Sequence, residues 1–164
     1  MIAVVDYGAG NVRSVMHALE YIGEKSLLTR NAGEILSADA VILPGVGAFG
    51  DAMEQLRASG AVQAMEEFIA SGRSFLGICI GEQLLFESSE ETPGAKGLCW
   101  LRGQVKRIPS GQGRKIPHMG WNQLNIMKDD PLFSGLPEKP WMYFVHSYYV
   151  HALQRDQVLA QVDY

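Results

Sequence analysis

The sequence predicts an α/β fold in which a doubly wound, mostly parallel sheet carries an added antiparallel β region. Up to about Thr92, short apolar runs alternate with segments of helical periodicity, as in a parallel sheet covered on both faces. Beyond Thr92 the apolar segments are separated by Gly/Pro turns, which is typical of antiparallel strands. The length of 164 residues suits one domain with a substantial core, so residues 1–164 are expected to form a single unit.

The elements of the first half follow this alternation in order. Ile2–Val5 is an apolar run of the kind that forms a buried parallel strand. The next helix is predicted to begin after Asn11, whose side chain can cap it, and to end at Gly23. Further strands are expected at 26–28, 40–43 and 74–76, and further helices at 51–57 and 62–70. In the second half, strands are expected at 98–108, 121–126, 142–150 and 158–162.

Composition excludes several classes of function. The net charge of −4 disfavours nucleic acid and anionic membrane surfaces as partners, and no apolar run is long enough to span a bilayer. The N-terminus lacks the pattern of a secretory signal, and Cys79 and Cys99 are expected to be thiols, so a cytoplasmic location is predicted. No Cys/His spacing indicates a metal site and no motif indicates a cofactor.

The most informative segment is Gly77-Ile78-Cys79-Ile80-Gly81, which lies between an apolar run and an amphipathic one. This strand–turn–helix pattern resembles a nucleophile elbow with sulfur in place of oxygen. Glycines on both sides allow a strained turn, and the N-terminus of the following helix is expected to favour the thiolate. The alternative is a buried structural cysteine, but such a residue does not need flanking glycines.

Other turns are expected to meet this elbow. Ligands of open α/β sheets bind at the carboxyl ends of the strands, and 6–11 and Pro44–Gly47 follow such ends, as Cys79 does. The thiol could attack a carbonyl carbon, with the Ile80 N–H as one oxyanion donor. A second donor is expected from the turn that contains Val46 and Gly47, although an ordinary tight turn is the alternative for that segment. The predicted chemistry is acyl transfer through a thioester.

A family resemblance rests on five segments in this order: 6–11, 43–50, 77–91, 115–122 and 143–148. Together they make the chain resemble the class I, triad-type glutamine amidotransferases. The last two segments are similar to the glutaminase subunits of imidazole glycerol phosphate synthase, which serve histidine biosynthesis. The resemblance extends from residue 1 to 164 and implies a flavodoxin-like sheet with an added antiparallel β region.

The resemblance also implies roles for matching residues. Cys79 matches the nucleophile that attacks the side-chain amide of L-glutamine, and Val46, Gly47 and Ile80 match the oxyanion hole. The implied partner is a (β/α)₈-barrel cyclase that receives ammonia, and no cofactor is implied. Positions that match glutamine-binding residues are Gln83, Glu91, Ser147 and Tyr148. Positions that match the partner-facing surface are Asn11, Met119, Trp121, Tyr143 and His146.

One departure from the family concerns the general base. The family carries a His-Pro-Glu segment near its C-terminus, whereas this sequence contains none, and its histidines are His17, His118, His146 and His151. The chain is therefore expected to be a C-terminally truncated domain that turns glutamine over poorly. Two alternatives remain open: a non-catalytic module that only docks on the cyclase, and a different cysteine hydrolase that uses His118 or His146 as its base.

A second departure is Glu82, which stands where the family usually has an apolar residue. Its carboxylate could raise the pKa of the Cys79 thiol. It could equally be a favourable acid in the first turn of a helix. Cys99 is expected to be a small apolar filler.

Overall fold

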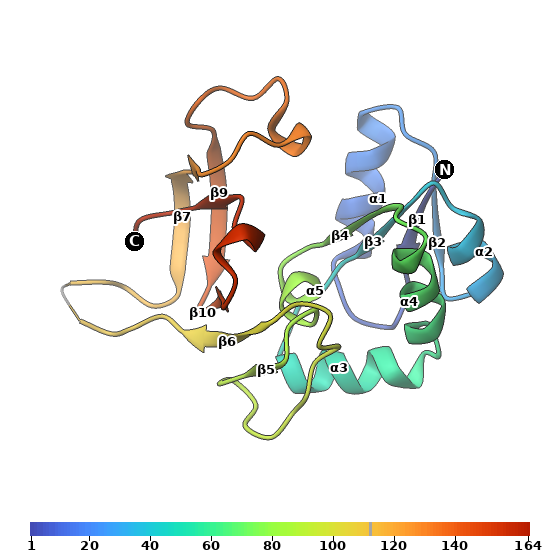
Figure 1. Ribbon diagram of the computed structural model, residues 1–164, viewed down its shortest axis with the longest axis horizontal. Coiled ribbons are helices and arrows are strands. Elements are labelled where there is room, and N and C mark those ends of the chain that lie inside the picture. Colours follow the sequence, from blue (N-terminus) through green and yellow to red (C-terminus); the bar gives the residue numbers. More distant parts are fainter. Residues whose placement is uncertain (112) are drawn as a thin grey trace.

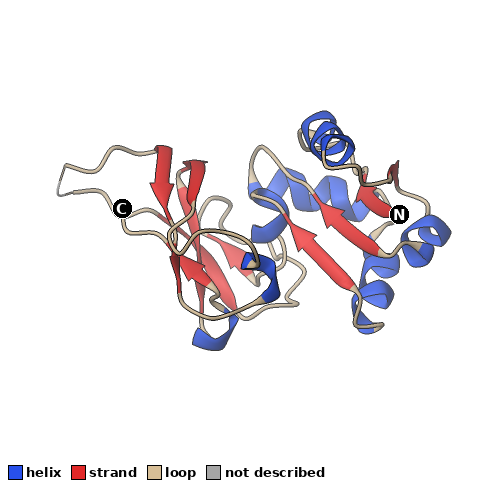
Figure 2. Cartoon of the chain, turned by 90° about the horizontal axis from the view of Figure 1, so that it is seen from above, coloured by secondary structure: helices blue, strands red, loops and turns tan. Residues whose placement is uncertain are grey.

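The first half of the chain forms a parallel sheet with helices on both faces (Figures 1 and 2). The computed structural model describes residues 1–111 and 113–164. The sheet has the order β2-β1-β3-β4, and all its pairings are parallel. Its strands are β1 (Ile2–Val5), β2 (Ser26–Thr29), β3 (Ala40–Leu43) and β4 (Ser74–Gly77). The helices are α1 (Val12–Tyr21), α2 (Ala32–Ser37), α3 (Phe49–Ala58), α4 (Val62–Ala70) and α5 (Ile80–Gln83). The α/β fold class is therefore confirmed.

The two faces of the sheet bury different apolar sets. On one face α1 covers a small cluster around Val4, Leu19 and Ile42. On the other face the main core is fully buried and includes Phe49, Met53, Leu56, Met65 and Phe68 from α3 and α4. Burial of each such side chain contributes about 1.5–3 kcal/mol. This core lies against β1, β3 and α5, and it fixes the end of the sheet where the candidate site is found.

The predicted ends of the first helix are confirmed. The Asn11 side chain accepts the Ser14 N–H at 3.3 Å, which satisfies one of the free donors at the start of α1. Gly23 has φ +81°, a conformation that glycine adopts without strain. The N–H of Glu24 then bonds to the Leu19 carbonyl, so the chain closes the helix with a hydrogen-bonded turn.

The second half is a set of small sheets beside the parallel one (Figure 1). β10 and β6 pair antiparallel, as do β7 with β9 and β11 with β8, whereas the short β5 pairs parallel with β6. The antiparallel region is thus confirmed in its main pairings. The strands are β5 (Ser88–Ser89), β6 (Gly103–Arg107), β7 (His118–Gln123), β8 (Asn125–Ile126), β9 (Trp141–His146), β10 (Tyr148–Ala152) and β11 (Ala160–Gln161). Two short 3₁₀ helices, Pro131–Phe133 and Arg155–Gln157, connect them.

Several predicted boundaries in this half were wrong. The expected strand at 98–108 begins only at Gly103, because the N–H groups of Leu98 and Trp100 bond to carbonyls of the turn after α5. The strand expected at 142–150 breaks at Ser147, where the chain leaves β7 as its partner and joins β6. The strand expected at 121–126 is split at Leu124 into the end of β7 and β8. The strand expected at 158–162 is shorter and consists only of β11.

Candidate active site

Cys79 occupies a strained turn between β4 and α5. Its φ of +56° and ψ of −115° are unusual for a residue with a side chain. A Cβ on Gly77 would lie 2.7 Å from the Glu82 Cα, and one on Gly81 would collide with the Leu43 carbonyl oxygen. The flanking glycines therefore allow the chain to fold tightly against itself, as the elbow pattern predicts. The strained backbone presents the thiol at the surface, since Cys79 is an exposed free cysteine.

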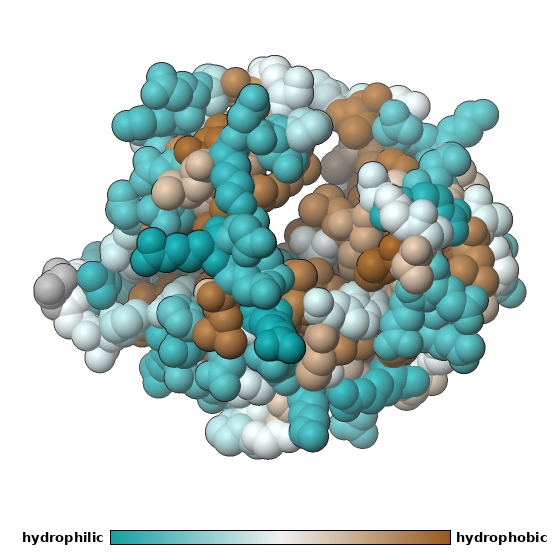
Figure 3. Space-filling view, viewed as in Figure 1, coloured by the Kyte–Doolittle hydropathy of each residue, from teal (hydrophilic) through white to brown (hydrophobic). Residues whose placement is uncertain are grey.

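A cavity of about 410 Å³ adjoins the thiol. Its walls come from the elbow, from the turn after β3 and from the β9–β10 junction, so it lies between the two halves of the molecule. Figure 3 shows a hollow between the two halves of the molecule, with apolar residues along part of its wall. All residues predicted for catalysis, the oxyanion hole or glutamine binding meet here. The lining is Val46, Gly47, Cys79, Ile80, Gln83, Glu91, Pro117, Val145, His146, Ser147 and Tyr148.

The turn after β3 is fixed at its start and free at its tip. The Pro44 carbonyl accepts the Tyr7 hydroxyl at 2.8 Å, and Gly45 packs so closely on the elbow that a Cβ would lie 2.6 Å from the Gly81 nitrogen. Val46, in contrast, is 51% exposed, and Gly47 has φ +94° with open space around its Cα. The tip of the turn therefore has open space beside it and lines the same cavity as the thiol.

Two of the polar side chains that line the cavity, Gln83 and Glu91, have oxygen atoms that could accept a hydrogen bond from a ligand. Gln83 is 7% exposed, and its Oε1 has no hydrogen-bond partner among the described residues. A buried amide oxygen without a partner is unfavourable by about 1–3 kcal/mol, which a bound donor would relieve. Glu91 accepts the Phe49 N–H at 2.8 Å at the start of α3. This contact holds its carboxylate at the cavity wall.

The N-terminus of α5 favours the Cys79 thiolate as expected, but packing and nearby carboxylates outweigh it. The protein packed around Cys79 raises the pKa of its thiol above the usual value, and the Ile80 N–H only partly opposes this effect. The nearby carboxylates of Glu82 and Glu91 raise it further. Burial is thus the largest cause of the raised pKa, and the single N–H of Ile80 does not offset it.

Glu82 combines the two roles considered for it. It is an acid in the first turn of α5, and it also raises the pKa of the Cys79 thiol. Surrounding protein atoms raise the pKa of the Glu82 carboxyl itself. Tyr7 lies in the same region, where burial and the charge of a Cys79 thiolate raise its pKa to about 12, so its hydroxyl stays protonated and keeps its bond to Pro44.

The histidines near the cavity are engaged in hydrogen bonds. His146 Nδ1 lies 2.8 Å from the Tyr148 carbonyl, and its Nε2 lies 2.9 Å from His118 Nδ1. Because a carbonyl only accepts, His146 Nδ1 carries the proton and His146 Nε2 accepts from His118. The His146 lone pair is thus already used, which argues against this residue as the base for Cys79. His118 lies behind it and does not line the cavity.

The residues predicted to face a partner do not form one set. Met119, Trp121 and Tyr143 lie on one face of the β7–β9 pair and are 61%, 64% and 54% exposed. His146 lies on the opposite face, because successive strand residues point to opposite sides. Asn11 is exposed in the other half of the molecule, where it caps α1. Sequence reasoning missed Pro117 and Val145 as cavity residues, since neither carries a chemical group that signals a site.

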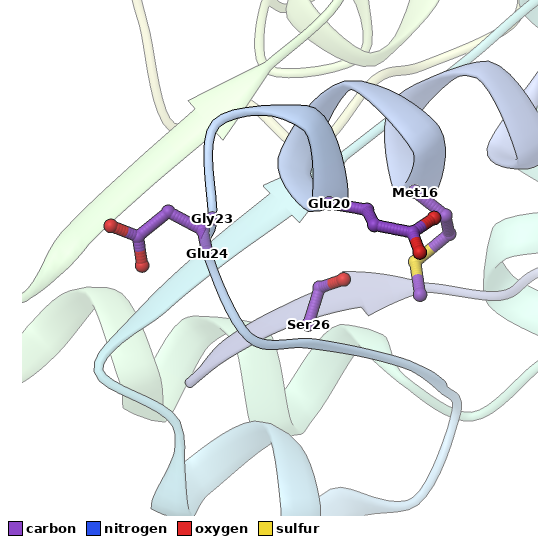
Figure 4. A pocket seen from close by; sticks show the side chains of 5 residues that line it. All are labelled: Met16, Glu20, Gly23, Glu24 and Ser26. Atoms are coloured by element: carbon purple, nitrogen blue, oxygen red, sulfur yellow. The ribbon is translucent and has the colours of Figure 1, made fainter.

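A second hollow, of about 380 Å³, lies between α1 and β2 (Figure 4). Its residues are Met16, Glu20, Gly23, Glu24 and Ser26, none of which belongs to a predicted site. The Glu24 carboxylate points away from Glu20 in Figure 4, so the two acids do not form a pair. Within residues 1–111 and 113–164, no cluster of three or more His, Cys, Asp or Glu side chains is arranged to hold a metal ion. No helix in these parts of the chain is long and apolar enough to cross a membrane.

Comparisons with known proteins agree with this geometry. The family model "Glutamine amidotransferase class-I" matches residues 3–163. The imidazole glycerol phosphate synthase subunit HisH of Oceanobacillus iheyensis is 47% identical over 164 residues, which are 100% of this chain and 81% of that protein. The HisH subunit of Caldanaerobacter subterraneus is 46% identical over 100% of this chain and 80% of its own length. A solved glutamine amidotransferase structure covers 98% of this chain and 80% of its own, with a TM-score of 0.72 and 21% identity. The chain therefore belongs to the class-I glutamine amidotransferases and, within them, to the group of HisH subunits.

Proposed function

We propose that this chain is the glutaminase subunit of imidazole glycerol phosphate synthase, which hydrolyses L-glutamine through a Cys79 thioester and passes ammonia to a cyclase partner. The observation that carries the proposal is the cavity, which joins an exposed thiol on a strained elbow to the unpartnered Gln83 amide oxygen. The HisH relatives support the same reading over the full length of this chain.

The chemistry follows from the positions of these groups. The Cys79 sulfur, once deprotonated, attacks the side-chain carbonyl carbon of glutamine and forms a tetrahedral oxyanion. The Ile80 N–H and a reoriented peptide group of Val46 or Gly47 are the proposed donors to that oxygen. The carbon–nitrogen bond then breaks, the nitrogen takes the proton given up by the thiol, and ammonia leaves. Water attacks the thioester, which releases glutamate and restores the thiol.

Substrate binding is assigned to one charged group and one neutral group of the cavity. The Glu91 carboxylate at the cavity wall suits the α-ammonium group of glutamine, because opposite charges attract strongly in a partly enclosed site. The Gln83 Oε1 suits an N–H donor of the substrate. Ser147 and Tyr148 form the facing wall and limit the length of the side chain that fits.

The described residues do not place an available general base beside the Cys79 thiol. In the parts of the chain that the structure describes, the cavity contains one imidazole, His146, and its free lone pair accepts a hydrogen bond from His118. We therefore propose that this 164-residue chain hydrolyses glutamine slowly, at least about 10³-fold below an enzyme with a positioned base. The docking-only alternative predicts instead that the chain binds the cyclase without producing ammonia.

The cyclase partner is assigned to the exposed apolar face of β7 and β9. Met119, Trp121 and Tyr143 are large side chains held side by side, and Trp121 and Tyr143 pack edge to face with ring centroids 5.6 Å apart. Aromatic and methionine side chains are enriched at protein interfaces. We propose that a barrel-shaped cyclase binds here and at Asn11, and that the complex acts in the cytoplasm.

The experiment compares the chain with its Cys79→Ala variant, each with and without the cyclase. The assays are glutamate release and intact-mass detection of a Cys79 adduct formed by a diazoketone analogue of glutamine. The proposal predicts slow, Cys79-dependent glutamate release and an adduct that excess glutamine prevents. Equal glutamate release by the two proteins would remove Cys79 as the nucleophile. Cyclase binding without any adduct would favour the docking-only alternative.

A further inference from the structure

The inner face of the β7–β9 pair contains a buried histidine that the proposed chemistry does not use. His118 is 1% exposed and lies between two aromatic rings. Its ring centroid is 4.7 Å from that of Phe144 and 3.8 Å from that of Tyr164, and both pairs are stacked. Burial lowers the pKa of His118, and nearby His146 lowers it further, so the ring is neutral at neutral pH. A neutral imidazole has one donor and one acceptor, which makes its hydrogen bonds directional.

Those hydrogen bonds form a chain with a single direction. Asn122 Nδ2 lies 2.6 Å from His118 Nε2, which accepts from it. His118 Nδ1 donates to His146 Nε2 at 2.9 Å, and His146 Nδ1 donates to the Tyr148 carbonyl at 2.8 Å. Each ring nitrogen of both histidines therefore has a partner. The chain begins on β7, crosses to β9 and ends on the backbone of a cavity residue.

This series of hydrogen bonds ends at Tyr148, beside a break between two sheets. β9 ends at His146 and β10 begins at Tyr148, so Ser147 belongs to neither ladder. From the other side, the Ser147 carbonyl accepts the Ile108 N–H at 2.9 Å. Between the β9 pairing of His146 with His118 and the β10 pairing of Tyr148 with Arg107, the junction is thus supported by the Ser147–Ile108 bond and by the hydrogen bonds of the two histidines.

We propose that His118 and His146, oriented by Asn122, are positioning residues that hold the Ser147–Tyr148 wall in the shape that binds substrate. The inference rests on the proposed glutaminase function for the identity of that substrate. If the two histidines only filled the core, any hydrogen-bond partners would satisfy their ring nitrogens. Here the final acceptor is a carbonyl of the cavity wall, and the sheet that supplies the chain carries the proposed partner face on its other side.

Two substitutions at His118 separate packing from positioning. His118→Phe keeps a ring between Phe144 and Tyr164 but removes both hydrogen bonds. His118→Asn loses the ring but keeps a donor near the place of Nδ1. A matched control is His151→Phe, because His151 is an exposed histidine of β10 outside the chain of bonds. Thermal unfolding establishes that each variant folds.

The measurements are the dependence of Cys79 labelling on the concentration of the diazoketone analogue, and amide hydrogen exchange of the 146–149 segment. Since a hydrogen bond contributes about 0.5–1.5 kcal/mol, His118→Phe is expected to raise the half-saturating concentration by about 3- to 10-fold, with little change in the maximal labelling rate. It should also speed exchange at 146–149. His118→Asn should bind the analogue more tightly than His118→Phe, although it unfolds at a lower temperature, and His151→Phe should match the parent chain.

The outcomes distinguish the inference from the function on which it rests. Unchanged half-saturation and unchanged exchange in His118→Phe would overturn the positioning role while leaving the glutaminase proposal intact. If His118→Asn lost as much affinity as His118→Phe, packing rather than the donor would account for the effect, which also overturns the proposal. If the parent chain were never labelled at Cys79, the proposed function would fail. Faster amide exchange at 146–149 in His118→Phe would then still show that the hydrogen bonds of the two histidines stabilise this wall.

Discussion

The Glu91 carboxylate accepts the backbone N–H of Phe49 at 2.8 Å, which ties the start of α3 to the wall of the cavity beside Cys79. A carboxylate is stabilised at a helix N-terminus by about 0.3–1 kcal/mol. The same negative charge raises the pKa of the Cys79 thiol. One side chain therefore anchors a helix, is suited to hold the substrate ammonium group and disfavours the thiolate when the cavity is empty.

The substitution Glu91→Gln tests these roles together. The amide oxygen of the introduced glutamine can still accept from Phe49, so the free energy of unfolding is expected to fall by no more than about 1 kcal/mol. Loss of the charge should weaken binding of the glutamine analogue by at least about 10-fold, because a charge-assisted hydrogen bond contributes about 1.5–3 kcal/mol. Without glutamine, alkylation of Cys79 by iodoacetamide should become faster, since the thiol pKa falls. Slower alkylation would contradict the electrostatic argument.

The pH dependence of Cys79 provides a second prediction. Because its pKa is raised in the folded chain, the rate of its alkylation should reach half of its plateau at a higher pH than for an unstructured cysteine. Glu82→Met removes one of the carboxylates that raise this pKa and should move the half-plateau to lower pH. The rate is followed by intact mass between about pH 6 and 10, around the usual thiol pKa near 8.5. An unchanged profile in Glu82→Met would show that Glu82 does not contribute and that burial and Glu91 account for the raised pKa.

The raised pKa of Cys79 also predicts how the free energy of unfolding depends on pH. A thiol with a raised pKa in the folded state holds its proton more tightly there than in the unfolded state. Its contribution is therefore fully present below the unfolded pKa and is lost as the pH rises through the folded one. Cys79→Ala should flatten the fall in stability that the parent chain shows on the alkaline side, as measured by urea unfolding at a series of pH values.

The elbow glycines yield a prediction about folding. A methyl group at Gly81 would collide with the Leu43 carbonyl oxygen, a backbone atom that cannot move without disturbing β3. Gly81→Ala is therefore expected to destabilise the chain by about 2–4 kcal/mol, in the range of overpacking combined with backbone displacement. Gly33→Ala is the matched control, since Gly33 lies in α2 and an added Cβ would meet only the capping Oδ1 of Asn31, at 3.2 Å, and no backbone atom. The control should lose much less stability than Gly81→Ala in the same urea unfolding experiment, because alanine favours the helix and only a side-chain atom must shift.

Sequence reasoning worked where local pattern and tertiary context agree. The strands Ile2–Val5 and Ala40–Leu43 and the helix Val62–Ala70 have the predicted bounds, because buried strands and amphipathic helices carry their own periodicity. It failed where long-range contacts decide. The apolar segment 98–102 was predicted as strand, yet its N–H groups bond to the turn after α5, whose carbonyls have no partner within that short helix.

The site shows the same division. The elbow and the turn after β3 could be found because glycine and cysteine spacing reports a backbone requirement directly. The orientation of His146 could not, because the break at Ser147 determines which sheet each neighbouring residue joins. The pKa direction of Cys79 also depends on packing and on the distant Glu91 carboxylate, neither of which the motif records. The catalytic and binding roles themselves stay predictions.

The edge of the parallel sheet provides a further prediction. In the described parts of the chain, β4 pairs with β3 on one side only, and Leu76 and Ile78 are 43% and 37% exposed. An apolar, unpaired strand edge is a template for association with other chains. Leu76→Lys is expected to reduce light scattering at high protein concentration while changing the free energy of unfolding by less than about 1 kcal/mol. Unchanged scattering would place the association surface elsewhere, with the β7–β9 face as the next candidate.

Trp121 provides the sharpest test of the partner face. It is 64% exposed and is held edge to face against Tyr143, so it presents a large ring with little freedom left to lose on binding. If a cyclase covers this face, Trp121→Ala should weaken its binding by about 2 kcal/mol or more, roughly 30-fold, as for a central aromatic at an interface. Tyr21→Ala is the control, because Tyr21 is 92% exposed on α1 and lies outside the predicted partner set. Affinity is measured by titration calorimetry with the cyclase. Because Trp121 does not line the cavity, labelling of Cys79 without the cyclase should be unchanged. A Trp121→Ala chain that binds the cyclase as tightly as the parent would exclude this face as the docking surface.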